Sequence, residues 1–178
     1  MKTSIKSSSR LLVPLAAALL VLSARGIAGS TLGGDDTDFV KKAAKGNLAE
    51  VELGRLAVQK AASPEVRNFG ERMIRDHSKA NHELSVLAAS KGVNLPKSIS
   101  LGEDVSVAHL KVLSGKSFDE AYIKMMVDDH KEDIAAFQKA ADGSQDPDVK
   151  RFATKTLPTL QSHLSKIEQI QGDFGGSK

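Results

Sequence analysis

Apolar side chains recur every three or four residues along four segments of the chain, the spacing that gathers them on one face of an α-helix. These segments span about residues 37–62, 64–91, 117–141 and 147–171. Two of them begin with a capping residue followed by proline, at Ser63 and Asp146, and a third begins with the capping-box sequence SFDE at Ser117. The pattern therefore predicts an all-α protein built from four long helices.

A connection of about 25 residues, 92–116, separates the second predicted helix from the third. A connection of this length in a compact bundle usually carries structure of its own, and the segment EDVSVAHLKVL within it has the pattern of a short helix. One long connection that crosses the bundle from end to end is typical of ferritin-like folds. We therefore expect a ferritin-like four-helix bundle whose long crossover, between helices 2 and 3, contains a short helix.

The first 30 residues have the pattern of a cleaved secretory signal. Lys2, Lys6 and Arg10 precede an apolar run at 11–22 that is too short to span a bilayer, and small residues follow it, with cleavage expected within 26–30. The sequence thus predicts a protein of the periplasm or the cell exterior, without a transmembrane anchor after signal cleavage. The expected parts are a signal peptide at 1–30, a four-helix bundle domain at 31–171 and a flexible tail at 172–178.

Removal of the signal changes the electrostatic balance of the chain. Four of the 25 basic residues lie within the signal and all 22 acidic residues lie after it, so 21 basic and 22 acidic residues remain and the formal net charge falls from +3 to −1. Such a balance gives no electrostatic basis for binding nucleic acid. The absence of cysteine also excludes disulfide bonds and a lipid anchor on cysteine.

Each of the four apolar faces contains one ionisable side chain near its middle. His77, His130 and His163 lie on the apolar faces of the second, third and fourth helices. On the first helix, Glu50 shares a face with small and apolar residues, whereas Glu52 lies among charged and polar residues and is expected to be solvated. A buried polar group without a partner costs about 2–7 kcal/mol, so we expect the four inward groups to meet one another or a bound ion.

Counting from the turns places these groups near the middle of the bundle. Glu50 and His77 lie at about the same level, 13 and 14 residues from Ser63. His130 and His163 differ by about four residues, or roughly 6 Å at a rise of 1.5 Å per residue. A kink at Pro158, within the fourth helix, could absorb part of this offset.

Imidazole and carboxylate ligands suit zinc, copper, iron or nickel, and three histidines with one carboxylate would complete a tetrahedral zinc shell. Met73 and Met126 each lie one turn before a histidine and are candidate copper ligands, although methionine more often fills gaps in a core. A di-iron oxidase is disfavoured, because that chemistry usually needs a glutamate three residues before each of two histidines. The chain has Ile74, Val127 and Leu160 at the corresponding positions.

Three other polar residues, Asp76, His82 and His109, are not expected to be direct metal ligands. Asp76 precedes a histidine, but adjacent helical side chains point about 100° apart, so we expect it to pair with Arg72 or Lys79, or to support an imidazole of a neighbouring helix. His82 and His109 fall outside the four apolar faces and are expected to be solvated.

The chain also carries four longer segments, AAKGNLAEVELGRLAVQKA, VRNFGERMIRDHSKAN, FDEAYIKMMVDDHKEDIAAF and FATKTLPTLQSHL. Together they resemble a bacterial exported family of unknown function, described as ferritin-like and often labelled as an outer-membrane protein. The resemblance covers residues 37–170, and the two Asp-His pairs with the LPTLQSH segment are its most specific parts. It implies a ferritin-like four-helix bundle exported to the periplasm or cell surface, with no established activity.

Two hypotheses follow for the function. The first is transition-metal binding, with zinc, copper or iron held by Glu50, His77, His130 and His163. The second is a non-catalytic cell-envelope or stress-related interaction protein, in which the same side chains form only a hydrogen-bonded network. No glycine-rich phosphate loop and no Ser-His-Asp pattern is evident, so the sequence predicts no catalytic residue and identifies no protein partner.

Overall fold

A computed structural model describes residues 31–98 and 105–176 of the chain. These residues form five α-helices and no strand: α1 (Gly34–Lys60), α2 (Pro64–Ser90), α3 (Val105–Val112), α4 (Gly115–Gly143) and α5 (Pro147–Gly176). The predicted all-α fold class is therefore confirmed. The predicted signal peptide, residues 1–30, lies outside the described residues.

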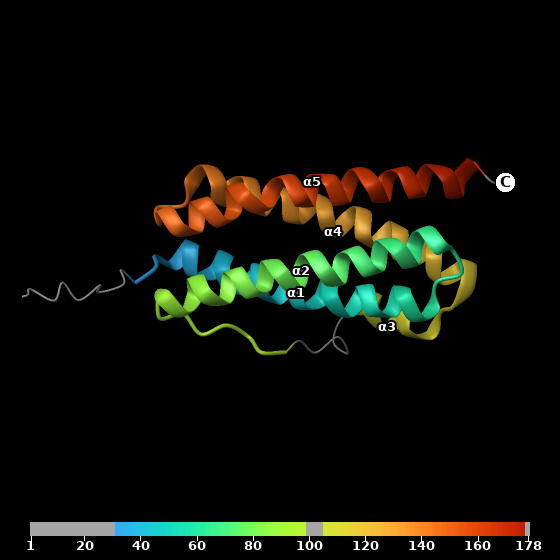
Figure 1. The fold of residues 1–178 in the computed structure, drawn as a ribbon, viewed down its shortest axis with the longest axis horizontal. Helices are drawn as coiled ribbons and strands as arrows, with labels where there is room; N and C mark the ends of the chain where they lie inside the picture. Colours follow the sequence, from blue (N-terminus) through green and yellow to red (C-terminus); the bar gives the residue numbers. More distant parts are fainter. Residues whose placement is uncertain (1–30, 99–104, 177–178) are drawn as a thin grey trace, which may run out of the picture.

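The four long helices run along one axis as two hairpins, α1 with α2 and α4 with α5 (Figure 1). α1 also contacts α4 and α2 contacts α5, so the two hairpins pack side by side and form a four-helix bundle. The short helix α3 packs against α4. Residues 99–104 of the long connection lie outside the described residues, so the full path of the predicted crossover stays a prediction.

Buried apolar side chains form two clusters, one toward each end of the bundle. The first includes Leu53, Met73, Val127 and Ile167, and the second includes Ala44, Leu84, Phe137 and Leu160. Between the two clusters lie buried polar side chains, Asn47 and Glu50 on α1, His77 on α2, His130 on α4 and His163 on α5. We call these five residues the polar layer. The interior of the bundle thus has one polar layer between two apolar ones.

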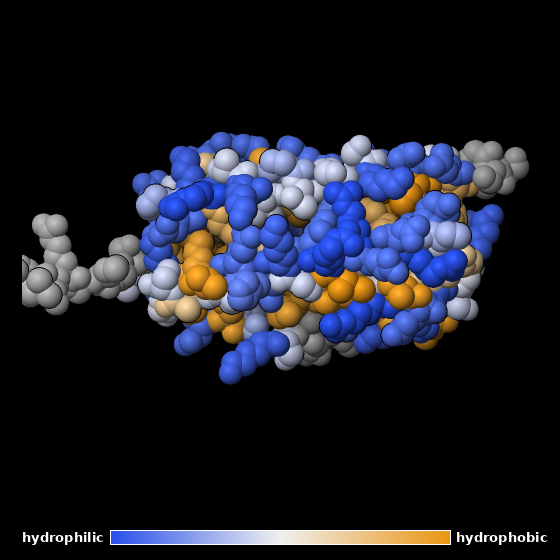
Figure 2. Space-filling model, in the orientation of Figure 1, coloured by the Kyte–Doolittle hydropathy of each residue, from blue (hydrophilic) through white to orange (hydrophobic). Residues whose placement is uncertain are grey.

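The face of the bundle seen in Figure 2 is mainly hydrophilic. Figure 2 shows one face of the molecule, where polar side chains predominate and apolar side chains gather in small separate patches. Among the described residues, the large apolar side chains that are exposed are Val58, Val86 and Val112. Over residues 31–98 and 105–176, none of the helices combines the length and the apolarity that a bilayer crossing needs.

Polar contacts hold the turn between α1 and α2 against the start of α4. The carboxylate of Asp119 in α4 accepts hydrogen bonds from the backbone N–H groups of Ala62, at 3.2 Å, and Ser63, at 2.8 Å. The hydroxyl of Ser63 in turn caps α2, as the sequence predicts, by accepting from the backbone N–H of Glu65 and Val66. One end of the bundle is therefore fixed by bonds to backbone groups that a helix leaves unpaired.

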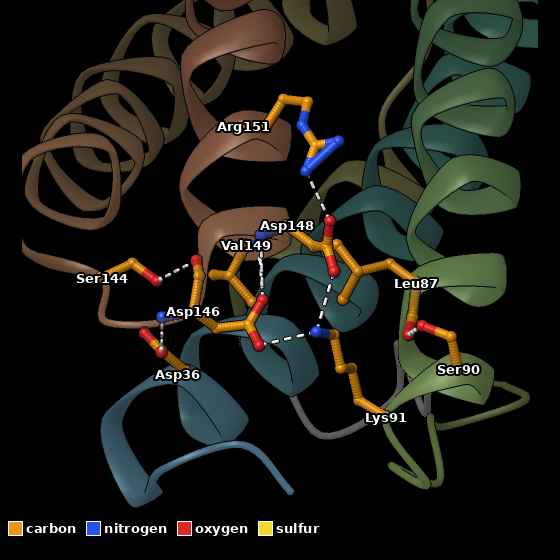
Figure 3. A network of polar contacts seen from close by, with 9 residues as sticks. All are labelled: Asp36, Leu87, Ser90, Lys91, Ser144, Asp146, Asp148, Val149 and Arg151. Carbon is orange, nitrogen blue, oxygen red and sulfur yellow. Dashed lines mark hydrogen bonds and ion pairs between the residues drawn. The ribbon is translucent and has the colours of Figure 1, made fainter. Parts of the chain in front are cut away.

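At the opposite end, Lys91 joins the end of α2 to the start of α5 (Figure 3). Its Nζ lies 2.7 Å from Oδ2 of Asp146 and 2.8 Å from Oδ2 of Asp148. Asp146 also caps α5, as expected, because its Oδ1 accepts from the backbone N–H groups of Asp148 and Val149. The N–H of Asp146 donates to Oδ2 of Asp36 at 3.0 Å, which adds α1 to the network.

Several predicted helix limits differ from the structure by one to five residues, and the start of α4 and the end of α5 are the two that change a contact or a cap. α4 begins at Gly115 after the N-cap residue Ser114, so Ser117 lies inside the helix and the expected capping box is wrong. Gly115 has a φ of 62°, a conformation that favours glycine, and the chain turns into the helix there. α5 continues to Gly176, beyond the boundary predicted at 171, and Phe174 of this added turn packs against the first apolar cluster.

Two glycines allow a close approach of α1 and α2. A methyl group on Gly54 would lie 2.6 Å from the carbonyl oxygen of Gly70, and one on Gly70 would lie 2.8 Å from that of Gly54. We expect Gly54→Ala to lower the free energy of unfolding by about 1–3 kcal/mol, because the two backbones must move apart. This loss should exceed the gain of about 1 kcal/mol that alanine brings to a helix interior.

Urea denaturation followed by circular dichroism measures this effect. Gly46→Ala is the matched control on the same helix, because its new methyl group would lie 4.0 Å from Oδ1 of Asp133. This control should be neutral or stabilising. Equal unfolding midpoints for Gly54→Ala and Gly46→Ala would show that the helices do not need the glycine at position 54.

Candidate metal centre

The three inward histidines of the polar layer meet at one point of the bundle. His77, His130 and His163 come from α2, α4 and α5 and are 2%, 0% and 1% exposed. One ring nitrogen from each lies within 4.8 Å of the other two, a separation that allows a single metal ion to bind all three. The structure thus brings together three side chains that the sequence places on separate helices.

The imidazole rings contact one another directly. The ring centroids are 5.3 Å apart for His77 with His163 and for His130 with His163, and 5.9 Å apart for His77 with His130. Nε2 of His130 lies 3.3 Å from Nδ1 of His163. Counting from the turn predicts an offset of about 6 Å along the bundle between His130 and His163, yet their rings are in contact. Counting assumes straight, parallel helices, whereas helices that cross or bend shift residues along the bundle axis.

The outward nitrogen of each ring is hydrogen-bonded to an oxygen. Nδ1 of His77 lies 2.9 Å from Oδ1 of Asn47, and Nδ1 of His130 lies 2.9 Å from the backbone carbonyl of Met126. Nε2 of His163 lies 3.0 Å from Oδ2 of Asp76. Carbonyl and carboxylate oxygens accept hydrogen bonds, so the imidazole N–H donates in each contact.

Burial keeps the three imidazoles neutral at physiological pH. Loss of solvent lowers the pKa of His77 to about 3 and that of His130 to about 4, and the neighbouring histidines add to both shifts. Burial also lowers the pKa of His163, although its hydrogen bond to Asp76 opposes this change. A neutral imidazole is the form that binds a metal, so protons compete little with an ion at this site.

Glu50 lies in the polar layer, but it does not belong to the group formed by the three histidine nitrogens. Its side chain is 3% exposed, as expected for an inward residue, but its Oε2 has no hydrogen-bond partner, whereas the sequence predicts that it meets the other inward groups or an ion. Burial raises its pKa well above the usual value, and Asp129 and Asp133 add to the increase. Glu50 is not in the group of three nitrogens within 4.8 Å, so its role as a metal ligand stays a prediction.

The side chain of Glu52 is 41% exposed and pairs with Arg55, as expected for a solvated residue.

Asn47, which holds the ring of His77, is not among the residues predicted from the sequence. Asn47 is 5% exposed and lies almost one turn before Glu50, so it belongs to the same inward face. A polar amide on an apolar face is the signal that would have found it. Phe69 was also overlooked: its ring lies edge-on to His130 and His163, with centroids 6.2 and 6.3 Å away, and covers one side of the site.

The structure also shows where the other histidines, Asp76 and the two candidate methionine ligands lie. His82 and His109 are exposed, as predicted. Asp76 pairs with Arg72, and also supports an imidazole of a neighbouring helix, so both of those expected contacts are present. Met73 and Met126 are fully buried in the first apolar cluster, and the backbone carbonyl of Met126 holds His130. A thioether ligand from either methionine stays a prediction.

Solved structures of low sequence identity share this fold. A DUF305 fragment from Deinococcus radiodurans has a TM-score of 0.71 at 15% identity, covering 80% of this chain and 99% of that one. CopM in the Cu(I)-bound form has a TM-score of 0.67 at 15% identity, with coverages of 78% and 96%. A predicted secreted DUF305 protein from Streptomyces coelicolor has a TM-score of 0.68 at 16% identity, with coverages of 79% and 94%. At these identities the likeness concerns the helical fold alone.

Sequence comparisons identify the family but no characterised relative. Curated protein sequences give no match. A family model described as a domain of unknown function, DUF4142, matches residues 23–170, which is most of the chain. The resemblance to a bacterial family of unknown function is thus confirmed, whereas the ferritin-like description and the outer-membrane label stay predictions. The chain belongs to the DUF4142 family.

Proposed function

We propose that this protein binds one transition-metal ion in the middle of its helical bundle, through His77, His130 and His163. The supporting observation is the direction of the ring nitrogens. Each ring donates its single N–H outward, to Asn47, Met126 or Asp76, so the remaining nitrogen of each ring presents a lone pair inward. Three lone pairs that converge in a dry interior repel one another and attract a cation.

The metal-free contacts support the same conclusion. Nε2 of His77 is buried and has no hydrogen-bond partner. Nε2 of His130 and Nδ1 of His163 are 3.3 Å apart, although neither carries a proton in the arrangement just described. An unpaired buried polar atom costs about 1–3 kcal/mol, and a bound ion removes that cost at all three nitrogens together. With the ring protons placed in this way, a network without an ion leaves all three nitrogens unpaired.

Copper is the first ion to test. Three neutral nitrogens bring no negative charge, and the cost of burying an ion rises steeply with its charge, which favours a monovalent ion such as Cu(I) over a divalent one. Imidazole is a suitable ligand for copper, zinc and iron alike. CopM, which shares the fold at 15–16% identity, has been solved in Cu(I)-, Ag- and Cu(II)-bound forms. That likeness identifies copper and silver as the ions to try first.

Glu50 is proposed as the fourth ligand when the ion is divalent. Its Oε2 is buried and unpaired, so this oxygen has no hydrogen bond to break when it turns toward an ion. An anionic oxygen would also balance the second charge of Zn²⁺ or Cu²⁺ and complete a tetrahedral shell. The proposal further includes export to the periplasm or cell exterior, removal of residues 1–30 and a ferritin-like path for the connection between α2 and α4.

The first prediction about the proposed metal site concerns the histidines. Protein without a histidine tag is expected to bind one Ag⁺ or Cu⁺ per chain, and His77→Gln with His130→Gln should weaken this binding by at least about 100-fold. Isothermal titration with Ag⁺ and elemental analysis measure the affinity and the stoichiometry. The matched control is His82→Gln with His109→Gln, two exposed histidines outside the polar layer. Weak binding that the two double variants share equally would instead favour the interaction protein that binds no metal.

The second prediction concerns pH. With pKa values of about 3 and 4, His77 and His130 stay neutral down to pH 5.5, so only His163 is expected to bind protons in competition with the ion. The Ag⁺ affinity should therefore fall by at most about tenfold between pH 7.5 and 5.5, against roughly 10³-fold for three unperturbed imidazoles. Titrations at several pH values measure the slope. A 10³-fold loss over this range would show that the ligands are solvated.

The third prediction concerns Glu50. Glu50→Gln should weaken Zn²⁺ binding by at least about tenfold and leave Ag⁺ binding nearly unchanged, because only the divalent ion needs the negative oxygen. Without metal, the parent should lose stability relative to Glu50→Gln as pH rises above the ordinary pKa of 4.5, since ionising a carboxyl group whose folded pKa is raised disfavours the folded state. Urea unfolding at pH 5 and pH 8 measures this difference. Equal loss of Zn²⁺ and Ag⁺ binding would indicate damage to the bundle rather than loss of a ligand.

A further inference from the structure

Asp76 differs from the other two groups that hold the outer nitrogens of the imidazoles. Asn47 is 5% exposed, and the carbonyl that holds His130 belongs to the fully buried Met126. The side chain of Asp76, in contrast, is charged and 24% exposed. Its Oδ2 also lies 3.2 Å from Nε of Arg72 and its Oδ1 lies 3.4 Å from Nε of Arg75. Among these three groups, Asp76 therefore links the buried site to the surface.

The ring of His163 has two neutral forms with opposite consequences for the site. With its proton on Nε2 it donates to Asp76, and its Nδ1 presents a lone pair to Nε2 of His130, 3.3 Å away. With its proton on Nδ1 it would instead donate to Nε2 of His130. The second form joins the two rings by a hydrogen bond and uses both of the lone pairs that a metal needs.

His77 has no such alternative, and the alternative of His130 gives up a bond to a backbone carbonyl. Nδ1 of His130 is held by the Met126 carbonyl, so moving its proton to Nε2 would break that buried hydrogen bond. Nε2 of His77 has no hydrogen-bond partner, so a proton moved there would gain no acceptor. Of these outer acceptors, Asp76 is the side chain that competes directly for the proton of His163, with a carboxylate oxygen at 3.0 Å against an imidazole nitrogen at 3.3 Å.

We infer that Asp76 is a positioning residue that keeps the site open, by holding His163 in the form with its proton on Nε2. This inference rests on the proposed function. Asp76 does not touch the ion; it acts by preventing His163 from closing the site against His130. Arg72 supports this arrangement through two contacts. It pairs with Asp76 on α2, and its Nη2 donates to Oγ of Ser162 on α5 at 2.9 Å; Ser162 is the residue before His163.

Three variants test the role of Asp76. Asp76→Ala removes the acceptor, whereas Asp76→Asn removes the charge but keeps an oxygen that accepts from Nε2. The matched control is Glu83→Ala, which breaks an ion pair between α2 and α5, Glu83 with Lys155 at 2.8 Å, without touching a histidine. Two measurements are made on each protein: the imidazole nitrogen shifts in long-range ¹H–¹⁵N spectra of the metal-free form, which identify the protonated nitrogen, and the affinity for Ag⁺.

In the parent, His163 should be protonated on Nε2. In Asp76→Ala the proton should move to Nδ1, and the Ag⁺ affinity should fall by about 10–100-fold, the usual effect of removing a group that orients a metal ligand. Asp76→Asn should restore the parent's nitrogen shifts and most of its affinity, and Glu83→Ala should match the parent in both measurements.

Protonation of His163 on Nδ1 in the parent would overturn the inference, and this result needs no variant to fold. Unchanged Ag⁺ affinity in Asp76→Ala would also overturn it. If the parent binds no Ag⁺ while the shifts of His163 follow Asp76 as described, the proposed function fails and the control of the ring by Asp76 survives. The two failures are therefore distinguishable.

Discussion

Five polar side chains are buried at the middle of the bundle, and each must find a hydrogen-bond partner or a ligand because water does not reach it. Apolar clusters on both sides of the polar layer exclude solvent, which strengthens every electrostatic interaction inside it. The same dryness lowers the pKa values of the histidines and raises that of Glu50. Neutral imidazoles, an unpaired carboxylate and converging lone pairs are thus consequences of one arrangement, a polar layer between two apolar ones.

More unpaired groups lie in this layer than elsewhere in the described interior. Five described side chains have a buried polar atom without a hydrogen-bond partner: Asn47, Glu50 and His77 belong to the polar layer, and Asn81 and Tyr122 lie outside it. Each such atom costs about 1–3 kcal/mol, a large fraction of the 5–15 kcal/mol that separates folded from unfolded states of a typical domain. The ends of the bundle carry the compensating contacts, with Asp119 at one end and the Lys91 network at the other. A rigid frame with an unsatisfied centre is suited to bind an ion with little rearrangement.

The sequence predicts which side chains face inward, because the helical period alone decides that, and the three histidines and Glu50 are buried as expected. It does not predict contacts that depend on how two helices are rotated and shifted by a few ångströms. Counting places Glu50 opposite His77, yet Asn47 makes the contact, and it places His130 and His163 at different levels, yet their nitrogens are 3.3 Å apart. The bond from His163 to Asp76 requires α2 and α5 to be neighbours, and no spacing within one helix contains that information.

The fold by itself does not require the polar layer. Helical bundles close well around a continuous apolar core, and DUF305 proteins form a similar bundle from sequences only 15–16% identical to this chain. Replacing buried polar groups by apolar side chains of similar volume is often neutral or stabilising, and here it would join the two apolar clusters into one continuous core. The polar layer therefore costs stability that packing does not repay. Because one nitrogen of each histidine lies within 4.8 Å of the other two, and Nε2 of His77 has no hydrogen-bond partner, the layer has the geometry on which the proposed cation site rests.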